Sequence, residues 1–289
     1  MKKLFVMLYA ILGLFVAPTI ANAQDVKHVE ISTIGKGDDV ILIPGLGSPP
    51  AVFDNVMDEI AKNHKVHIVH VAGYAGLPLE TNEGPIFNPV ADDITKYIKE
   101  NNLKNVTIIG HSMGGELGMA LAARNPSLVK KVMVVDALPY YSLYLDKNAT
   151  PESMTPRAKA FAAMIAAQNI DQFTAAQKVA IARLVKSDEK REMVLGWSLA
   201  SNRHAIAQGV EDLMTIDLRP VLKNNQAQIK LIYGYDKAMG LTQEFVDKLY
   251  DGAYAGIPNV EKQRIDNSLH FIMYDQPEQF KNAVLEFVK

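Results

Sequence analysis

The chain has 289 residues and no cysteine, and its 30 Lys and Arg residues are nearly balanced by 32 Asp and Glu residues. Without cysteine, disulfides, thiolate metal sites and a cysteine nucleophile are excluded. The formal net charge of −2 excludes the strongly basic surface of nucleic-acid-binding proteins, so we expect no nucleic-acid partner.

Residues 1–23 have the features of a bacterial signal peptide. Lys2 and Lys3 precede an apolar run over residues 4–16, and an Ala-Asn-Ala cleavage site ends at Ala23. The apolar run is shorter than the about 20 residues that cross a bilayer, so we expect no stable membrane anchor. The segment therefore predicts export to the periplasm or the medium, with cleavage after Ala23.

Apolar, β-branched runs then alternate with helical patterns along most of the chain. Strands are expected at residues 26–33, 40–43, 66–71, 106–109, 132–135, 229–233 and 260–265. Helices are expected at residues 52–62, 89–101, 112–124, 243–250 and 277–288. Alternation of this kind is typical of an α/β fold with a mostly parallel sheet and crossover helices.

The alternation stops between residues 136 and 217, where helical patterns occur without a clear strand. Thr155-Pro156 has the features of a helix start, because a hydroxyl residue precedes a proline at the first helical position. We expect a helical lid insertion at residues 137–216. The α/β core is expected to consist of residues 24–136 and 217–289.

A GxSxG motif, Gly110-His111-Ser112-Met113-Gly114, joins the strand expected at 106–109 to the helix that follows it. A serine in this context sits in a strained turn that lifts its hydroxyl clear of the sheet, and glycines at the flanking positions avoid steric clashes. Ser112 is therefore a candidate nucleophile. The alternative interpretation is a glycine-rich turn with a helix-capping serine.

With this motif, the chain resembles the α/β-hydrolase superfamily from about Gly35 to Lys289. Ile43–Ser48 resembles the loop after the family's third strand, Tyr233–Asp236 its acid-bearing turn, and Ser268–Glu278 its histidine loop and final helix. The order of nucleophile, acid and histidine is also the family's. The resemblance implies an α/β-hydrolase fold, with a mostly parallel central sheet, helices on both faces and an inserted helical lid.

The residues at these positions suggest a catalytic triad. A serine hydroxyl is a weak nucleophile at neutral pH and needs a neighbouring base, for which we choose His270. A carboxylate would hold the imidazole in one tautomer, and Asp236 is our first choice for it. Asp136, at the end of the strand at 132–135, is the alternative acid, because some family members carry the acid there; Asp266 is a further candidate.

The same resemblance implies an oxyanion hole. Backbone N–H groups of Met113, directly after the nucleophile, and of Leu46, in the loop after the strand at 40–43, match the family's two positions. Such donors stabilise the charge that develops on the substrate oxygen.

No motif indicates a cofactor or a metal ion. His64, His67 and His70 alternate between the two faces of a strand, which is a poor arrangement for a metal site. The two Gly-x-Gly sequences, at residues 35–37 and 45–47, complete neither a dinucleotide-binding motif nor a P-loop. His111 is expected to pack or hydrogen-bond locally.

These features predict an exported serine hydrolase that cleaves a small or medium acyl ester through an acyl-enzyme on Ser112. Tyr140, Tyr141 and Tyr144, together with the apolar lid, favour an apolar acyl group. Lactone, thioester, amide, carbon–carbon and perhydrolase chemistry remain open, because one fold hosts all of them. The alternative is a periplasmic ligand-binding or sensing protein on the same fold with little turnover.

Overall fold

The computed structural model describes residues 19–20, 27–80 and 84–289. Of the expected signal peptide, residues 1–23, only the two-residue strand β1 (Thr19–Ile20) belongs to the described part, and the rest lies outside it. Within the described ranges, no helix is both long and apolar enough to cross a membrane.

One sheet organises the described chain, with the strand order β1-β2-β4-β3-β5-β6-β7-β8. β2 pairs antiparallel with both β1 and β4, and all the other neighbouring pairs are parallel. The mostly parallel sheet expected from the sequence is confirmed. The strands are β2 (Val29–Gly35), β3 (Asp38–Ile43), β4 (His64–Val71), β5 (Val106–His111), β6 (Val129–Val135), β7 (Gln228–Tyr235) and β8 (Val260–Asp266).

The central strands are apolar because helices cover both faces of the sheet. Val40 to Ile43 of β3 are all buried, whereas β8, at the edge, keeps Glu261 and Lys262 exposed. A continuous apolar run is typical of a strand that is buried on both sides, and polar residues are tolerated at the edge. This contrast places the core of the protein around β3, β5 and β6.

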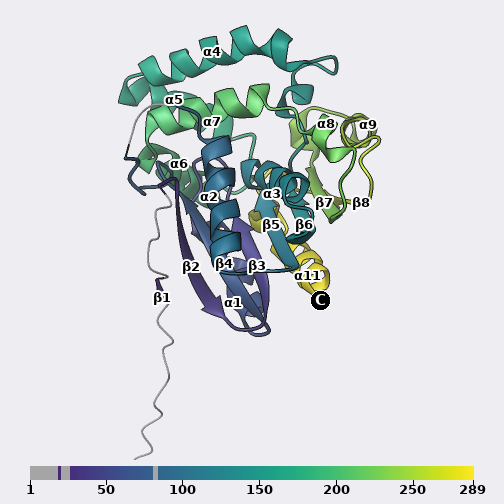
Figure 1. The fold of residues 1–289 in the computed structure, drawn as a ribbon. Coiled ribbons are helices and arrows are strands. Elements are labelled where there is room, and N and C mark those ends of the chain that lie inside the picture. The colour runs from purple at the N-terminus through teal and green to yellow at the C-terminus, as the bar shows by residue number, and fades with distance from the viewer. Residues whose placement is uncertain (1–18, 21–26, 81–83) are drawn as a thin grey trace, which may run out of the picture.

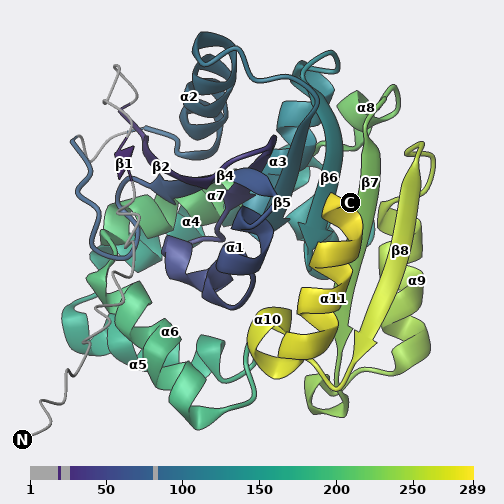
Figure 2. The ribbon, with the colours of Figure 1, turned by 90° about the horizontal axis from the view of Figure 1, so that it is seen from below.

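Two groups of helices form the two covering layers. On one face, α1 (Asp54–Ala61) and α11 (Pro277–Val288) lie side by side and share an apolar cluster with η1 (Pro50–Phe53) and α10 (Ile272–Asp275) (Figure 2). On the other face, α2 (Phe87–Glu100), α3 (Met113–Arg124) and α9 (Gln243–Ala253) contribute to a second cluster. The two clusters lie on opposite sides of the sheet, which makes a three-layer core.

A helical insertion separates β6 from β7. Figure 1 shows α4, α5 and α7 gathered above one end of the sheet. The insertion contains η2 (Tyr141–Tyr144), α4 (Pro151–Ala167), α5 (Ile170–Ile181), α6 (Asp188–Ala200), α7 (Arg203–Thr215) and α8 (Arg219–Leu222). After β7, a short η3 (Lys237–Met239) leads to α9.

The first long helix of the insertion begins earlier than the sequence suggested. Thr150 is the N-cap of α4, where its hydroxyl accepts from the Ser153 amide, and Pro151 occupies the first turn. The expected start at Thr155-Pro156 is therefore wrong, and Pro156 lies inside the helix. Thr150 and Pro151 give the same hydroxyl-proline signal, and Ser153 completes a capping box that stabilises the earlier start.

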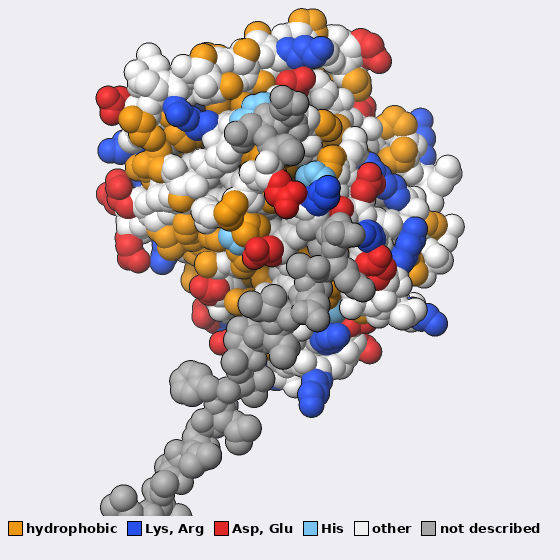
Figure 3. Space-filling model, turned by 60° about the vertical axis from the view of Figure 1, so that its left-hand side comes forward, with side chains coloured by type: hydrophobic (Ala, Val, Ile, Leu, Met, Phe, Trp, Pro, Cys, Tyr) orange, Lys and Arg blue, Asp and Glu red, His pale blue; other side chains and the backbone are white. Residues whose placement is uncertain are grey.

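Acidic and basic side chains are interspersed on the surface. Figure 3 shows both signs scattered over one face, with apolar side chains between them. This distribution agrees with the formal net charge of −2.

Candidate active site

Ser112 lies at a sharp turn between β5 and α3. Its backbone has φ 53° and ψ −124°, a conformation that non-glycine residues rarely adopt. A Cβ on Gly110 would lie 2.1 Å from the Gly114 carbonyl oxygen, and a Cβ on Gly114 would lie 2.0 Å from that of Ile43. Any side chain at Gly110 or Gly114 would clash with these carbonyl oxygens, so only glycine fits at either position. The same tight turn that strains the Ser112 backbone therefore requires the two glycines of the motif.

His270 lies in the loop after β8, and its ring contacts a carboxylate. The His270 Nδ1 atom is 2.6 Å from Asp136 Oδ2. Asp136 follows β6 directly, is buried, and adopts a left-handed backbone conformation with φ 53°. Its backbone N–H donates to the Ile232 carbonyl at 2.8 Å, which ties this turn to β7.

Asp136 receives two further hydrogen bonds. The Gly234 amide donates to its Oδ1 atom at 2.9 Å, and the Tyr250 hydroxyl donates to the same oxygen at 2.8 Å. The Tyr250 hydroxyl is also 2.5 Å from that of Tyr144. Burial and the charge of Asp136 raise the pKa of Tyr250, so this tyrosine is neutral and remains a donor. Together with His270, these contacts hold the Asp136 side chain in one orientation.

Asp236, the first choice for the acid, does not lie beside His270 in the structure. Its Oδ2 atom accepts from Lys186 Nζ at 2.6 Å, and its Oδ1 atom accepts from the Ala238 amide at 2.8 Å. These two hydrogen bonds lower the pKa of Asp236. The expected contact between Asp236 and His270 is corrected, because Asp236 caps η3 and pairs with the insertion. Among the described residues, the carboxyl group that contacts His270 is that of Asp136, the alternative acid.

The side chain of Asp266, the third candidate acid, also has a partner other than His270. It ends β8 and accepts from Arg264 Nε at 2.7 Å. Its side chain is largely exposed, which suits a surface ion pair rather than a buried triad position.

His111 packs against the loop that contains His270 and hydrogen-bonds to it. It is buried, its Nε2 atom is 3.2 Å from the His270 carbonyl, and the two rings have centroids 4.6 Å apart. Burial lowers the pKa of His111 well below its usual value, so the ring is neutral and donates through Nε2. The expectation that His111 packs and hydrogen-bonds locally is confirmed.

Residues 184–186 of the insertion form hydrogen bonds with the same loop. The Phe271 amide donates to the Leu184 carbonyl at 2.9 Å. Lys186 Nζ donates to the Asn267 carbonyl at 3.1 Å, and the Lys186 amide donates to Asp275 Oδ1 at 3.0 Å. We call these three contacts the insertion clamp; they join residues 184–186 to residues 267–275.

The loop after β3 brings backbone donors close to Ser112. A Cβ on Gly45 would lie 3.0 Å from the Ser112 Cβ, so the loop passes directly beside Ser112. The amides of Leu46 and Met113 donate to no carbonyl in the turns and helix caps of the described chain. Leu46 itself lines the cavity at this site. Both N–H groups are therefore available for an acceptor on a ligand.

A cavity of about 700 Å³ joins these elements to the insertion. Ser112, Asp136 and His270 line it together with the loop that contains Leu46. Most of the remaining wall is apolar. The insertion contributes, among others, Tyr144, Leu145, Phe161, Met164, Ile165 and Ile181.

The sequence profile of a family described as alpha/beta hydrolase fold matches residues 39–277. This chain belongs to that family. The expected α/β-hydrolase fold is thereby confirmed.

Curated relatives of this alpha/beta hydrolase include esterases. A pimeloyl-[acyl-carrier protein] methyl ester esterase of Nitrosospira multiformis is 23% identical over 273 residues, which cover 90% of this chain and 97% of the relative. The enzyme of the same name from Shewanella oneidensis is 28% identical over 214 residues, covering 70% and 76% of the two chains.

Solved structures share the fold of this hydrolase at low identity. An esterase from Exiguobacterium antarcticum has a TM-score of 0.74 and 18% identity, with 90% of this chain and 95% of that chain covered. An enol-lactonase from Burkholderia xenovorans has a TM-score of 0.70 and 17% identity, covering 90% and 96%. At these identities, the likeness shows the fold.

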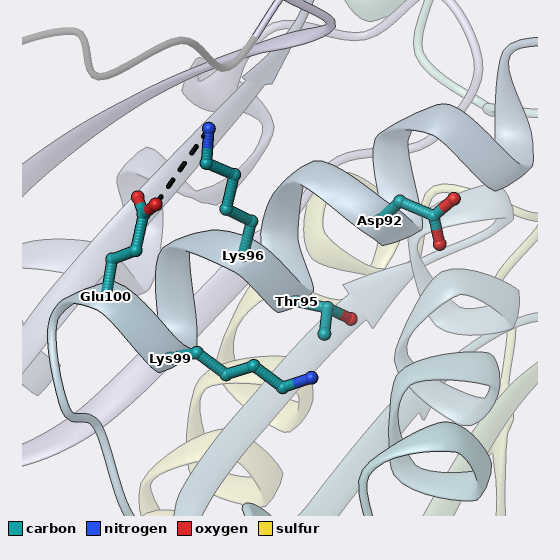
Figure 4. Close-up of a pocket in the computed structure, with 5 residues that line it drawn as sticks. All are labelled: Asp92, Thr95, Lys96, Lys99 and Glu100. Atoms are coloured by element: carbon teal, nitrogen blue, oxygen red, sulfur yellow. Dashed lines mark ion pairs between the residues drawn. The ribbon is translucent and has the colours of Figure 1, made fainter.

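A second depression on this alpha/beta hydrolase lies on the outer surface of α2 (Figure 4). Its lining is charged with both signs, and Lys96 Nζ is 3.9 Å from Glu100 Oε1. None of the residues that line it lines the cavity at Ser112. The lining residues are Asp92, Thr95, Lys96, Lys99 and Glu100.

Tyr250 and Glu116 are among the residues of the cavity in this hydrolase that sequence reasoning missed. Tyr250 is one of two aromatic residues in the amphipathic helix α9, and nothing in the sequence connects it with Asp136. Glu116 did carry a signal, because it is the one acidic residue in the otherwise apolar and glycine-rich helix α3.

Proposed function

We propose that this protein is a serine hydrolase that cleaves a small or medium carboxylic ester through an acyl-enzyme on Ser112. The observation that carries the proposal is the 2.6 Å contact between His270 Nδ1 and Asp136, formed in the cavity that Ser112 also lines. The esterase names of the curated relatives support an ester as the substrate.

His270 acts as the base in this proposal. A carboxylate can only accept, so the Nδ1–H of His270 donates to Asp136, and this leaves Nε2 free to take the Ser112 proton. As the serine oxygen attacks the ester carbonyl, the imidazolium forms and Asp136 stabilises its charge. His270 then returns the proton to the leaving alcohol, and the acyl-enzyme remains.

The second half of the cycle repeats these steps with water. His270 takes a proton from water as the water attacks the acyl carbonyl, and it then gives this proton to the Ser112 oxygen as the carboxylic acid leaves. In both halves, the amides of Leu46 and Met113 are proposed to donate to the oxyanion. One such donor typically contributes about 3–4 kcal/mol to stabilising the transition state.

The cavity favours an apolar acyl group. Its wall is built largely from aliphatic and aromatic side chains of the insertion, such as Phe161, Met164 and Ile165. Burying a methylene group there contributes about 0.8 kcal/mol, so affinity should rise with chain length until the cavity is filled. The basic start and apolar run of residues 1–23 support export to the periplasm or the medium as part of the same proposal.

The test is to treat the folded mature protein with a fluorophosphonate probe and to map the adduct by peptide mass. We expect an adduct on Ser112 that is lost in His270→Ala. A series of p-nitrophenyl esters of increasing chain length then gives kcat/KM, which Ser112→Ala should lower by about 10³- to 10⁶-fold.

The contrary result would be a folded protein without an adduct and without ester turnover. If Ser112→Ala then still bound an apolar ligand as tightly as wild type, the binding or sensing alternative would replace the hydrolase proposal.

A further inference from the structure

Glu116, an acidic residue of the cavity, has no part in the chemistry described so far. It lies on α3, one helical turn after the nucleophile, and its amide donates to the Ser112 carbonyl at 3.2 Å. It lines the cavity, and only 2% of the residue is exposed. One turn of a helix spans about 5.4 Å, so the backbone of Glu116 lies about this far from that of Ser112 along the helix axis.

The Glu116 carboxyl is not satisfied by the protein. Its Oε2 atom has no hydrogen-bond partner among the described residues. Burial raises the pKa of Glu116 well above its usual value, so the group is neutral over a wider pH range than an exposed glutamate. An unpaired polar group in a buried position is costly, and it needs an explanation.

The neighbouring hydroxyls do not provide that explanation. Tyr254 already donates to the Ala137 carbonyl at 2.7 Å. Burial followed by the Glu116 carboxyl raises the pKa of both Tyr141 and Tyr254, and Arg157, which also lines the cavity, acts in the opposite direction on Tyr141. Both tyrosines therefore stay neutral.

We propose that Glu116 is a specificity-determining residue whose neutral carboxyl donates a hydrogen bond to a second oxygen in the acyl chain of the substrate. The preferred substrate is then an ester whose acyl chain is mostly apolar and carries a keto or hydroxyl oxygen a few bonds from the scissile carbonyl. This inference rests on the proposed function, because it assumes ester cleavage at Ser112.

The chemistry of the cavity fits this substrate class. A neutral carboxyl offers one O–H donor, and a ketone offers only acceptors, so the two groups are complementary. The surrounding wall accommodates the hydrocarbon part of the chain. A plain alkanoate would leave the Glu116 donor unpaired, and an unsatisfied buried donor costs about 1–3 kcal/mol.

The experiment compares two esters of equal chain length, p-nitrophenyl levulinate and p-nitrophenyl pentanoate, which differ by one ketone oxygen. Each kcat/KM is divided by the spontaneous hydrolysis rate of the same ester. We expect wild type to prefer levulinate by about 5- to 100-fold. Glu116→Met, which has a similar size and no donor, should lose the preference, whereas Glu116→Gln, which keeps an N–H donor, should retain most of it.

A second measurement uses only the wild-type protein. The levulinate-to-pentanoate ratio should fall as pH rises through the titration of Glu116, because an ionised carboxylate cannot donate. Any pH effect that the two esters share cancels in the ratio.

Two results would overturn the proposal. An equal ratio in wild type and Glu116→Met, with Ser112 still labelled by the fluorophosphonate, would make Glu116 a structural residue and leave the hydrolase proposal intact. Absence of both labelling and turnover would overturn the hydrolase proposal, and this inference with it.

Discussion

The turns after β6 and β7 each place an aspartate one residue beyond a strand, and the two strands are neighbours in the sheet. Asp136, after β6, is held by His270, Gly234 and Tyr250. Asp236, after β7, is held by Lys186 and by the turn that it caps. Two aspartates at similar positions therefore have different partners. The partners, rather than the positions, decide which aspartate can orient His270.

Gly234 explains how this difference arises. A Cβ at Gly234 would lie 2.5 Å from the Leu269 carbonyl oxygen, so only glycine lets the histidine loop pass so close to β7. The Gly234 amide also donates to Asp136. The same residue thus admits the loop that carries His270 and orients the carboxylate that His270 contacts.

Exchanging each aspartate for asparagine tests the comparison most severely. Asp136→Asn should lower kcat by about 10³- to 10⁴-fold, because an amide can leave His270 in the wrong tautomer. Asp236→Asn should lower it by less than about tenfold, since its partner is Lys186. Steady-state kinetics on a p-nitrophenyl ester, with circular dichroism to check folding, measures both. The reverse ranking would return the triad acid to Asp236.

Removing the Tyr250 hydroxyl tests how much the hydrogen bonds to Asp136 contribute. Tyr250→Phe deletes a hydrogen bond to a buried carboxylate, which is worth about 1.5–3 kcal/mol, and kcat should fall by about 10- to 100-fold. The loss should appear in kcat rather than in KM, because the hydrogen bond holds the Asp136 side chain that contacts His270. Tyr235→Phe, whose hydroxyl donates to the Leu241 carbonyl, is the control. An unchanged kcat would make Tyr250 a packing residue only.

A third carboxylate, Glu116, extends the comparison because its Oε2 atom has no partner among the described residues. Its pKa is raised on folding, so between the unfolded and folded pKa values the native state binds more protons than the unfolded state. Stability should therefore fall as pH rises above about 4.5, by at most about 1.4 kcal/mol per pH unit from this group. Urea unfolding of wild type and Glu116→Gln at several pH values tests this, and parallel curves would contradict it.

The smallest effect is expected at the ion pair of Asp236. Its pKa is lowered by Lys186, so the pair stabilises the fold above the unfolded pKa of Asp236 and loses this contribution as pH falls through the folded value. Because Lys186 is 42% exposed, Lys186→Met should cost only about 0.2–1 kcal/mol at neutral pH. Chemical denaturation at neutral and acidic pH measures it. A cost that persisted in acid would point instead to the hydrogen bond from Lys186 Nζ to the Asn267 carbonyl.

Much of the fold followed from sequence periodicity, because buried parallel strands and amphipathic helices have different repeats. The sequence also singled out Ser112, whose turn needs glycines on both sides, and the structure has those close contacts. The acid could not be chosen in this way. Both Asp136 and Asp236 end a buried strand, and their partners come from segments distant in the chain, at His270 and Lys186. Pairing across such separations leaves no local pattern.

The insertion clamp has a mechanical consequence. Leu184 lines the cavity, and residues 184–186 also bind the loop that carries His270 through Phe271, Asn267 and Asp275. The position of His270 is therefore coupled, through these hydrogen bonds, to the segment of the insertion that joins α5 to α6.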